Sequence, residues 1–569
     1  MVNDEALIAH LLTRMAEILQ RYGREEENLK VLSKPLPASQ LRPLFDQHMA
    51  LPEQGAKDKA GSDTEAAEDI LGLVETILQH SARTVSPRFM DKLYAGSDAI
   101  GQIAELVIAV LNTNVHVYSV SPVATLMEHA CIHALSEAVG FATPCSGVFS
   151  PGGSASNLLA MTTARNTLFP DLKRVGAARS GQLLTVFTSV EAHYSIQKSA
   201  IVMGLGSDSV VAIPVNAAGY GGSGVGGGID PVELRNLIQQ SAGLGETPFF
   251  INLTAGTTVL SSFDPIQECV AAVRALEAEL GRKIWIHVDG SYGGPVIFSK
   301  KWKERLFRGI ELVDSITLNP HKILGVPQQC SVLLVNSDRW GRKVLWEANG
   351  LRADYLFHDS EMSPGLPTTP SVREGEEDNG FMMDMGDATI GCGRKADAVK
   401  LFICWTFHGT QGWARRVDKA LENVDTLARL FASSKQFQLV IPFSKESQDE
   451  VYGGGRLTVG VWCIPQALQS RYGQLQEFMN QSKNPKSSAH VLLKRITKLV
   501  HVELTRRGRF MIDFMGLKWQ DLPDFIRVAV SSDRIDNALL HELFNELEGI
   551  VSRVEVVDFE QGIVSLREE

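Results

Sequence analysis

A lysine at the end of an apolar, β-branched run has the setting in this chain that most suggests chemistry. The run is Asp314-Ser-Ile-Thr-Leu-Asn-Pro-His-Lys322, and Lys322 ends it beside His321 and Asn319. A pocket that disfavours the ammonium form lowers the pKa of a lysine, and the free amine can then hold a carbonyl group as a Schiff base. Most single lysines are solvated surface charges, so Lys322 alone does not establish this chemistry.

A second strand-like run ends in an aspartate. The run Trp285-Ile-His-Val-Asp289 is short and apolar, and Asp289 precedes Lys322 by 33 positions (322 − 289). A pyridoxal phosphate enzyme needs this pair, because the lysine carries the cofactor's aldehyde and the aspartate keeps the pyridine nitrogen protonated. The two residues together favour that class of enzyme over a chance surface lysine.

A glycine- and serine-containing segment could hold the phosphate of such a cofactor. Ser150-Pro-Gly-Gly-Ser-Ala-Ser-Asn157 precedes an apolar helical stripe. Unpaired backbone N–H groups at a helix start, together with the helix dipole, favour an anion. A Gly-Gly turn with an ordinary serine cap is the alternative. Beside Asp289 and Lys322 we predict a phosphate site, formed by Gly153, Ser154, Ala155 and Ser156.

Two other segments are predicted to be loops. The run 219–228 is rich in glycine, but no Lys-Ser or Lys-Thr pair follows it, so a flexible surface loop is a better interpretation than a P-loop. The stretch 359–380 is rich in Pro, Glu and Asp and has little to bury, which predicts a mobile loop.

Composition narrows the class of protein. The chain has 569 residues, is 44% apolar and carries a net charge of −11, which argues against a nucleic-acid partner. Its seven cysteines show neither a CxxC pair nor a His/Cys cluster at zinc spacing, so we predict reduced thiols, no metal site and a cytoplasmic location. The N-terminus lacks a signal-peptide pattern and no run of 18 apolar residues occurs, so no membrane association is expected.

The apolar runs predict an α/β fold with a largely parallel sheet. Ligands in such sheets gather at the carboxyl ends of the strands, where Asp289 and His193 fall. Strands are predicted near 183–188, 210–214, 248–253, 284–289, 314–318 and 331–335, alternating with helices such as 264–280.

The two ends of the chain have patterns of their own. An amphipathic helix is predicted over about 5–22, and either its own domain or a partner subunit must cover its apolar stripe. A polar linker is predicted near 52–66, with helices resuming near Ala67. After a helix at 395–408, the C-terminal part is predicted to have strands at 437–441, 456–462 and 526–530 and a helix at 488–507.

Three blocks together resemble the pyridoxal-phosphate-dependent group II amino acid decarboxylases, in particular the glutamate, cysteine sulfinate and aspartate 1-decarboxylase branch. The blocks are Asn319-Pro-His-Lys322, His287-Val-Asp289 and Ser150 to Asn157, and the similarity runs from about Pro87 to Val530. The resemblance implies pyridoxal phosphate fold type I (aspartate aminotransferase-like), with a mostly parallel seven-stranded sheet in the large domain.

The same resemblance implies a division of the chain and an assembly. It places an N-terminal helical segment at 1–125, the cofactor-binding domain at 126–429 and a small C-terminal α+β domain at 430–569. It also implies a homodimer with the active site at the interface between the subunits.

Roles for further cofactor-site residues come from the resemblance alone. It implies that His193, after the strand-like run that ends at Ser189, stacks on the cofactor ring, although a single histidine at a strand end is more often structural. Thr254, Asn319 and His321 are implied to contact the cofactor. Tyr355 is implied to be the acid of a catalytic loop, although the family's usual Ala-Gly-Tyr is Ala-Asp-Tyr here.

Three residues are implied to line the substrate pocket. Arg527 matches the arginine that binds a substrate carboxylate, and the fork of a guanidinium suits that task; an ordinary strand-edge charge is the alternative. Lys92 stands where the glutamate enzymes have glutamine, and His116 stands where they have an aromatic ring. All three bring positive or titratable groups, so we predict an acidic substrate.

The resemblance and the residues together predict a pyridoxal phosphate decarboxylase of a small acidic L-amino acid: aspartate, cysteine sulfinate, cysteate or glutamate. Lys322, His193, Tyr355 and Asp289 are the expected catalytic residues. Alternatives are an aromatic substrate, a decarboxylative reaction that forms an aldehyde, and a catalytically silent relative. The presence of Lys322, Asp289 and Tyr355 argues against the last.

Overall fold

The computed structural model of the chain describes residues 2–24, 30–31, 36–45, 53–56, 60–94, 96–216, 227–351, 353, 383–441, 443–444, 451–452, 455–472, 475–517 and 522–568. Tyr355 and the predicted loop at 359–380 lie outside these residues. Most of the glycine-rich run also lies outside them; its last residue, Gly228, begins the short strand β6 (Gly228–Ile229).

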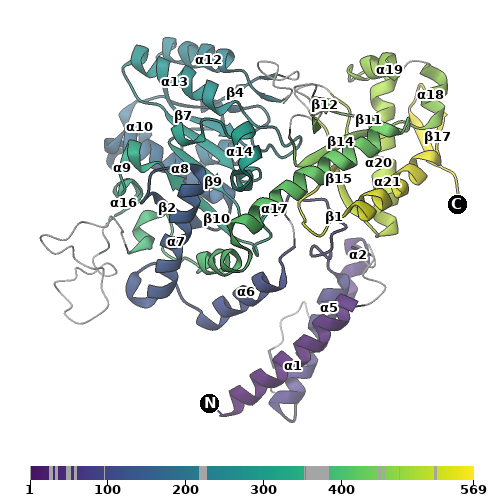
Figure 1. The fold of residues 1–569 in the computed structure, drawn as a ribbon, viewed down its shortest axis with the longest axis horizontal. Helices are drawn as coiled ribbons and strands as arrows, with labels where there is room; N and C mark the ends of the chain where they lie inside the picture. Colours follow the sequence, from purple (N-terminus) through teal and green to yellow (C-terminus); the bar gives the residue numbers. More distant parts are fainter. Residues whose placement is uncertain are drawn as a thin grey trace, which may run out of the picture.

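A seven-stranded sheet forms the centre of the large domain (Figure 1). Its order is β2-β10-β9-β8-β7-β3-β4, and every strand runs in one direction except β10, which is antiparallel to both neighbours. The strands are β2 (Ser146–Ser150), β3 (Leu184–Ser189), β4 (Val210–Ile213), β7 (Thr247–Thr254), β8 (Trp285–Gly290), β9 (Ser315–Leu318) and β10 (Ser331–Val335). The predicted mostly parallel sheet of fold type I is therefore confirmed.

The sheet is apolar because helices cover it. Strands buried on both faces read as continuous rather than alternating apolar runs, and all residues of β8, β9 and β10 are buried. The predicted helix at 264–280 is α13 (Ile266–Leu280). The other helices of this domain include α7 (Pro122–Val139), α8 (Gly153–Leu168), α11 (Ser195–Val202), α12 (Pro231–Gly243), α14 (Lys300–Leu306) and α16 (Val344–Asn349).

One long helix joins the two domains. Helix α17 (Asp397–Ser433) is interrupted at Gly409, whose φ of 68° is left-handed, so the predicted helix at 395–408 is only its first part. Its second half packs on the small domain through α21 (Asn537–Ser552) and β14 (Thr458–Cys463). The predicted domain boundary at 429/430 falls within this helix.

The small domain contains a five-stranded sheet in the order β1-β15-β16-β14-β11. Strand β1 is only Phe89–Met90 and pairs parallel to β15 (Met511–Met515), so part of the predicted N-terminal segment joins the C-terminal sheet. The remaining strands are β16 (Phe525–Ala529) and β11 (Phe437–Leu439), and α20 (Ser488–Arg507) packs against the sheet at its predicted bounds.

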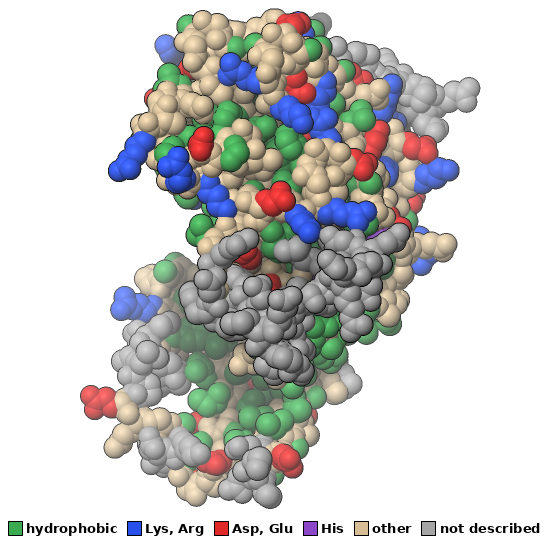
Figure 2. All heavy atoms as spheres, turned by 90° about the vertical axis from the view of Figure 1, so that its left-hand side faces the viewer, with side chains coloured by type: hydrophobic (Ala, Val, Ile, Leu, Met, Phe, Trp, Pro, Cys, Tyr) green, Lys and Arg blue, Asp and Glu red, His purple; other side chains and the backbone are tan. Residues whose placement is uncertain are grey.

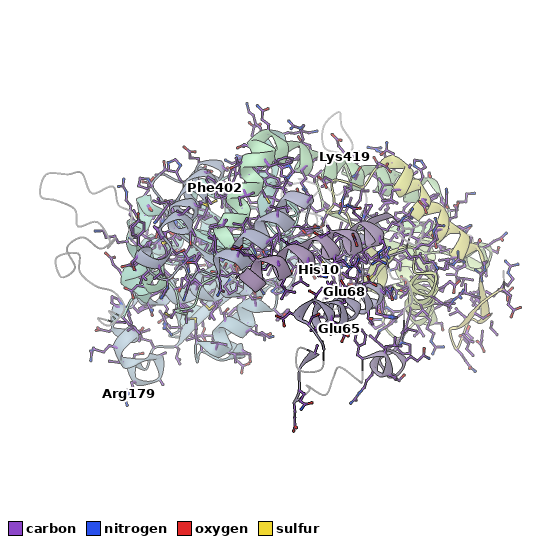
Figure 3. The ribbon with its side chains drawn as sticks, turned by 90° about the horizontal axis from the view of Figure 1, so that it is seen from below. His10, Glu65, Glu68, Arg179, Phe402 and Lys419 are labelled. Atoms are coloured by element: carbon purple, nitrogen blue, oxygen red, sulfur yellow. The ribbon has the colours of Figure 1, made fainter. Side chains whose placement is uncertain are left out.

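The N-terminal helices project from the rest of the molecule (Figure 1). Helix α1 (Val2–Arg24) packs against α5 (Asp63–His80). In Figure 3, His10 of α1 points toward Glu68 of α5, with the ring Nε2 2.8 Å from the carboxylate. Helix α5 begins before the predicted Ala67, because Ser62 caps it by accepting a hydrogen bond from Glu65 N at 3.2 Å.

Among the residues that the structure describes, no helix is both long and apolar enough to span a bilayer. All seven cysteines lie within the described residues as free thiols, and five of them are buried.

Candidate active site

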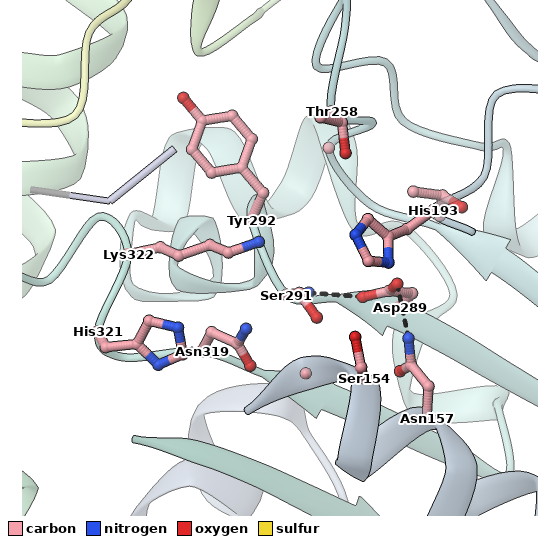
Figure 4. A pocket seen from close by; sticks show the side chains of 13 residues that line it. Ser154, Asn157, His193, Thr258, Asp289, Ser291, Tyr292, Asn319, His321 and Lys322 are labelled. Atoms are coloured by element: carbon pink, nitrogen blue, oxygen red, sulfur yellow. Dashed lines mark hydrogen bonds between the residues drawn. The ribbon is translucent and has the colours of Figure 1, made fainter. Parts of the chain in front are cut away.

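A cavity of about 190 Å³ lies at the carboxyl ends of the parallel strands (Figure 4). The ends of β7 and β8, the start of α8 and the segment after β9 surround it, as expected for an open parallel sheet. Its lining consists of Gly153, Ser154, Asn157, His193, Thr254, Gly256, Thr258, Asp289, Ser291, Tyr292, Asn319, His321 and Lys322.

The cavity brings together most of the residues predicted to contact a cofactor. Of that predicted set, only Ala155 and Ser156 do not line it; Ser156 Oγ instead lies 2.8 Å from Ser331 Oγ below the helix. Five of the lining residues had no role predicted from the sequence. Three of them stood in the Ser150 to Asn157 block or within three residues of Asp289, so position alone could have suggested them: Asn157, Ser291 and Tyr292. The other two are Gly256 and Thr258.

Lys322 extends into this cavity, where burial disfavours the ammonium form of its side chain. Burial lowers its pKa, although the nearby charge of Asp289 acts in the opposite direction. Its Nζ lies 5.9 Å from the centre of the Tyr292 ring. A lowered pKa makes the free lone pair that Schiff-base chemistry requires more accessible on a lysine that faces a cavity.

Asp289 is held as a carboxylate at the end of β8. Burial alone would raise its pKa, but hydrogen bonds from Ser291 and the charge of Lys322 outweigh burial and lower it. Its Oδ1 accepts from Ser291 N at 3.0 Å, and its Oδ2 accepts from Asn157 Nδ2 at 2.8 Å (Figure 4). A fixed negative charge in the cavity can therefore pair with a protonated ring nitrogen.

Both histidines of the cavity are neutral. Burial lowers the pKa of His193, and its Nδ1 accepts a hydrogen bond from Ser195 N at 3.2 Å. Burial also lowers the pKa of His321 to about 4. Figure 4 shows the His193 ring beside Asp289, at the far end of the cavity from His321. A neutral ring at this place is suited to stacking on an aromatic cofactor.

The start of α8 can accept an anion only because Gly153 has no side chain. A Cβ at Gly153 would lie 2.3 Å from Ser291 Oγ and 2.8 Å from Asn319 Nδ2, closer than real atoms approach. The preceding Gly152 has a φ of 137°, and its position provides no side-chain cap for the helix. The first N–H groups of α8 therefore remain available for a phosphate.

These features fit pyridoxal phosphate. Lys322 would hold its aldehyde, Asp289 its ring nitrogen and the start of α8 its phosphate, with His193 placed beside the ring. When bound, the cofactor supplies an electron-withdrawing ring that weakens a bond to the α-carbon of an amino acid.

The three predicted substrate residues lie apart from this cavity. Arg527 is a neighbour of Tyr292, whose hydroxyl donates to Leu457 O at 3.0 Å. Burial raises the pKa of that hydroxyl to about 12, and the positive charge of Arg527 acts in the opposite direction. Lys92 Nζ lies 2.7 Å from Asp513 Oδ2. His116 lies elsewhere, where its carbonyl oxygen accepts from Gly386 N at 2.8 Å.

Comparison with known proteins agrees with this geometry. Residues 50–449 match the family described as the pyridoxal-dependent decarboxylase conserved domain. The L-aspartate decarboxylase dtxS4 of Metarhizium robertsii is 38% identical over 413 residues, covering 72% of this chain and 73% of that protein. Mouse CSAD has a similar structure, with a TM-score of 0.78 and 28% identity, covering 97% of this chain and 99% of that one.

A more distant structure shows the same fold. The Oryza sativa TDC, solved with PLP and tryptamine, is 17% identical with a TM-score of 0.75, covering 96% of this chain and 97% of that one.

The chain therefore belongs to the pyridoxal-dependent decarboxylases. Within that family it is a group II amino acid decarboxylase of the glutamate, cysteine sulfinate and aspartate 1-decarboxylase branch. The predicted enzyme class and cofactor, pyridoxal 5′-phosphate, are thus confirmed.

Proposed function

We propose that this decarboxylase acts on a small acidic L-amino acid: aspartate, cysteine sulfinate, cysteate or glutamate. The sequence similarity to an L-aspartate decarboxylase supports the acidic class. The structural observation that carries the proposal is a buried arginine, Arg527, whose hydrogen-bonding capacity the described part of the chain does not fill.

Arg527 is 1% exposed, and among the described residues only one of its three nitrogens has a partner. Its Nη2 donates to Asp91 O and lies 3.2 Å from Asp513 Oδ2. Its Nε and Nη1 are buried and have no partner among the described residues. Leaving a buried charged donor unsatisfied is costly, and a substrate carboxylate would satisfy it with charge-assisted hydrogen bonds.

Lys92 is a weaker candidate than the sequence suggested. Its side chain is 54% exposed and already lies within 4 Å of two carboxylates, Asp513 at 2.7 Å and Asp91 at 3.1 Å. Its charge is therefore balanced by the protein, and no substrate carboxylate is required to neutralise it. The acidic substrate class then rests on the similarity to the L-aspartate decarboxylase, and Arg527 remains the candidate partner of a substrate carboxylate.

In the proposed reaction Lys322 holds the cofactor, Asp289 sustains the positive ring nitrogen and His193 covers one face of the ring. Arg527 orients a substrate carboxylate. Tyr355, which lies outside the described residues, is the proposed acid that gives a proton to the α-carbon after carbon dioxide leaves.

Exchanging Arg527 for lysine tests the substrate proposal. Lysine keeps the positive charge but loses the planar fork, so kcat/KM for the best acidic substrate should fall at least tenfold, or about 1.4 kcal/mol. Carbon dioxide release is measured with the four acids and with two aromatic amino acids in competition.

Lys92→Gln is the matched comparison for that experiment. Because Lys92 is paired and half exposed, its loss should change kcat/KM by less than about threefold. A larger loss in Lys92→Gln than in Arg527→Lys would return Lys92 to the pocket. Faster release from an aromatic amino acid than from all four acids would refute the acidic substrate while leaving the decarboxylase assignment intact.

We also propose that the protein is a homodimer whose interface includes helix α6 (Ala99–Leu111). Figure 2 shows hydrophobic side chains gathered in the lower half of the molecule, over this helix and the N-terminal helices. The exposed apolar side chains of α6 are Ile103, Leu106, Val107, Val110 and Leu111. Solvent-exposed apolar patches of this kind mark sites of association.

The position of His116 supports an active site at that interface. His116 lies five residues after the end of α6 and does not line the cavity of its own subunit. In a dimer joined through α6, its ring would lie beside the partner. An active site shared by two subunits would therefore explain why His116, a predicted substrate-pocket residue, does not line the cavity of its own subunit.

Val110→Asp should weaken this dimer. Val110 is 78% exposed, and a carboxylate there would be desolvated on association. Analytical ultracentrifugation at low micromolar concentration should show monomer for Val110→Asp and dimer for Val232→Asp, which alters an exposed valine on α12. If both variants sediment as the wild-type protein does, α6 is not in the interface.

Finally, we propose a cytoplasmic location, supported by the free thiols of all seven cysteines, which suit a reducing compartment.

A further inference from the structure

A continuous chain of buried hydrogen bonds leads to Asp289 from behind the cavity. Trp285 Nε1 lies 2.8 Å from Ser315 Oγ, which lies 2.8 Å from Nδ1 of His287. His287 Nε2 lies 3.1 Å from Asn157 Oδ1, and Asn157 Nδ2 lies 2.8 Å from Asp289 Oδ2. All five side chains are buried. His287 itself does not line the cavity, so it can reach the cofactor site only through its neighbours.

The two ends of this chain fix the direction of every bond in it. The indole N–H of Trp285 can only donate, and the ionised carboxylate of Asp289 can only accept. Asn157 therefore turns its NH2 group to Asp289 and its Oδ1 to His287, which must carry a proton on Nε2. Since burial lowers the pKa of His287 to about 4, the ring is neutral. Its bare Nδ1 then accepts from the Ser315 hydroxyl.

Strand geometry explains why these side chains meet. His287 and Asp289 are two residues apart on β8, so both point to the same face of the sheet. Ser315 is the register partner of His287 on β9. Helix α8 packs on β8 and brings Asn157 between His287 and Asp289. Bonds aligned in one direction polarise each other, so the alignment strengthens the last bond, the one that Asp289 accepts.

We propose that His287 is a positioning residue for the cofactor site. As the neutral Nε2–H tautomer it fixes the Asn157 amide, which in turn holds the Asp289 carboxylate in the orientation that a protonated pyridine nitrogen needs. Asn157 Nδ2 also lies 3.1 Å from Ser195 Oγ, so His287 acts on the Oδ1 side of the amide; without its N–H donor that side is unpaired and the amide is held less firmly against Asp289. This inference rests on the assignment of pyridoxal phosphate and is independent of the substrate proposed above.

Cofactor affinity tests the proposal without substrate or turnover. Full-length apoprotein is titrated with pyridoxal phosphate, and the dissociation constant is measured by equilibrium dialysis. His287→Phe fills the space but removes the N–H donor, so binding should weaken roughly tenfold or more. His287→Gln restores an N–H donor directed at Asn157, so its dissociation constant should lie within about threefold of the wild-type value.

Phe250→Leu controls for packing damage alone. Phe250 stacks on His287 with ring centres 5.7 Å apart and lies on the neighbouring strand β7. Its truncation should lower Tm while leaving the dissociation constant of the cofactor unchanged. Wild-type affinity in His287→Phe, or an equal loss of affinity in His287→Phe and His287→Gln, would overturn the proposal, because the N–H donor would then be irrelevant.

If His287→Phe does not fold, the tautomer of His287 can be measured in the wild-type protein instead. Nitrogen-15 spectra of histidine-labelled protein report which ring nitrogen carries the proton, and the signal absent in His287→Gln identifies His287. We expect a proton on Nε2 alone from about pH 6 to pH 8, with no titration. A proton on Nδ1, or protonation of both nitrogens in that range, would contradict the proposed tautomer.

Discussion

Lys322→Ala is expected to abolish the visible absorbance of the bound cofactor and to lower kcat by roughly 10³-fold or more, since loss of a nucleophile has effects of that size or larger. Among the residues that the structure describes, Lys322 is the only lysine that lines the cavity. Burial lowers its pKa and so favours the nucleophilic amine, a function that an alanine methyl group cannot replace. Absorbance spectra of the purified variant, recorded with added cofactor, and carbon dioxide release measure the two effects.

Two further variants separate nucleophilicity from charge. Lys322→Arg keeps a cation, but a guanidinium is not deprotonated in proteins, so it should be as inactive as Lys322→Ala. Lys300→Ala removes an exposed lysine at the start of α14 and should keep both the absorbance and the rate. Wild-type spectra and turnover in Lys322→Ala would mean that another group carries the cofactor.

Lys322 and Asp289 could be predicted because their signals are local. Each ends an apolar run, and each is a residue type that a buried strand does not need for packing. Strand ends are also where an open α/β sheet places its ligands. Residue type and position at or just after the ends of two apolar runs therefore indicated the pair, without knowledge of any contact between distant parts of the chain.

Lys92 shows that residue type and local position do not reveal contacts between distant parts of the chain. Its ion-pair partner Asp513 lies 421 residues later in the chain, and nothing in the sequence near Lys92 indicates that pairing. Strand β1 (Phe89–Met90) is too short for an alternating pattern, so its place beside β15 was also not predictable.

Two features that were not predicted, helix α21 and the true start of α5, have recognisable capping residues in the sequence. Helix α21 (Asn537–Ser552) has an N-cap, Asp536, that accepts from Leu539 N, and a regular apolar stripe. The start of α5 has the Ser-x-x-Glu pattern of a capping box at Ser62 to Glu65. Both elements could have been predicted from helix-start rules alone. The polar chain behind Asp289 could not, because His287 and Ser315 meet only through the strand register.

Asp289→Asn is expected to weaken cofactor binding and slow the reaction together, by roughly 100-fold or more in kcat, or about 2.7 kcal/mol. The structure holds Asp289 charged despite its burial, so the native site provides an acceptor with a full negative charge. An amide offers at best a neutral oxygen, or a donor that suits the unprotonated ring nitrogen. The ring would then withdraw electrons less strongly from the substrate.

A variant of a second buried carboxylate, Asp314, tests whether the loss of cofactor affinity in Asp289→Asn arises in the cavity. Asp314 is fully buried before β9, at the opposite end of the sheet, where it accepts from Arg274, Arg339 and Ile286 N. Asp314→Asn should lower the free energy of unfolding, because it removes a buried, hydrogen-bonded charge. It should leave the affinity for pyridoxal phosphate unchanged. If Asp314→Asn and Asp289→Asn reduce affinity equally, the loss reflects general destabilisation; if Asp289→Asn keeps the wild-type rate, Asp289 has no part in the reaction.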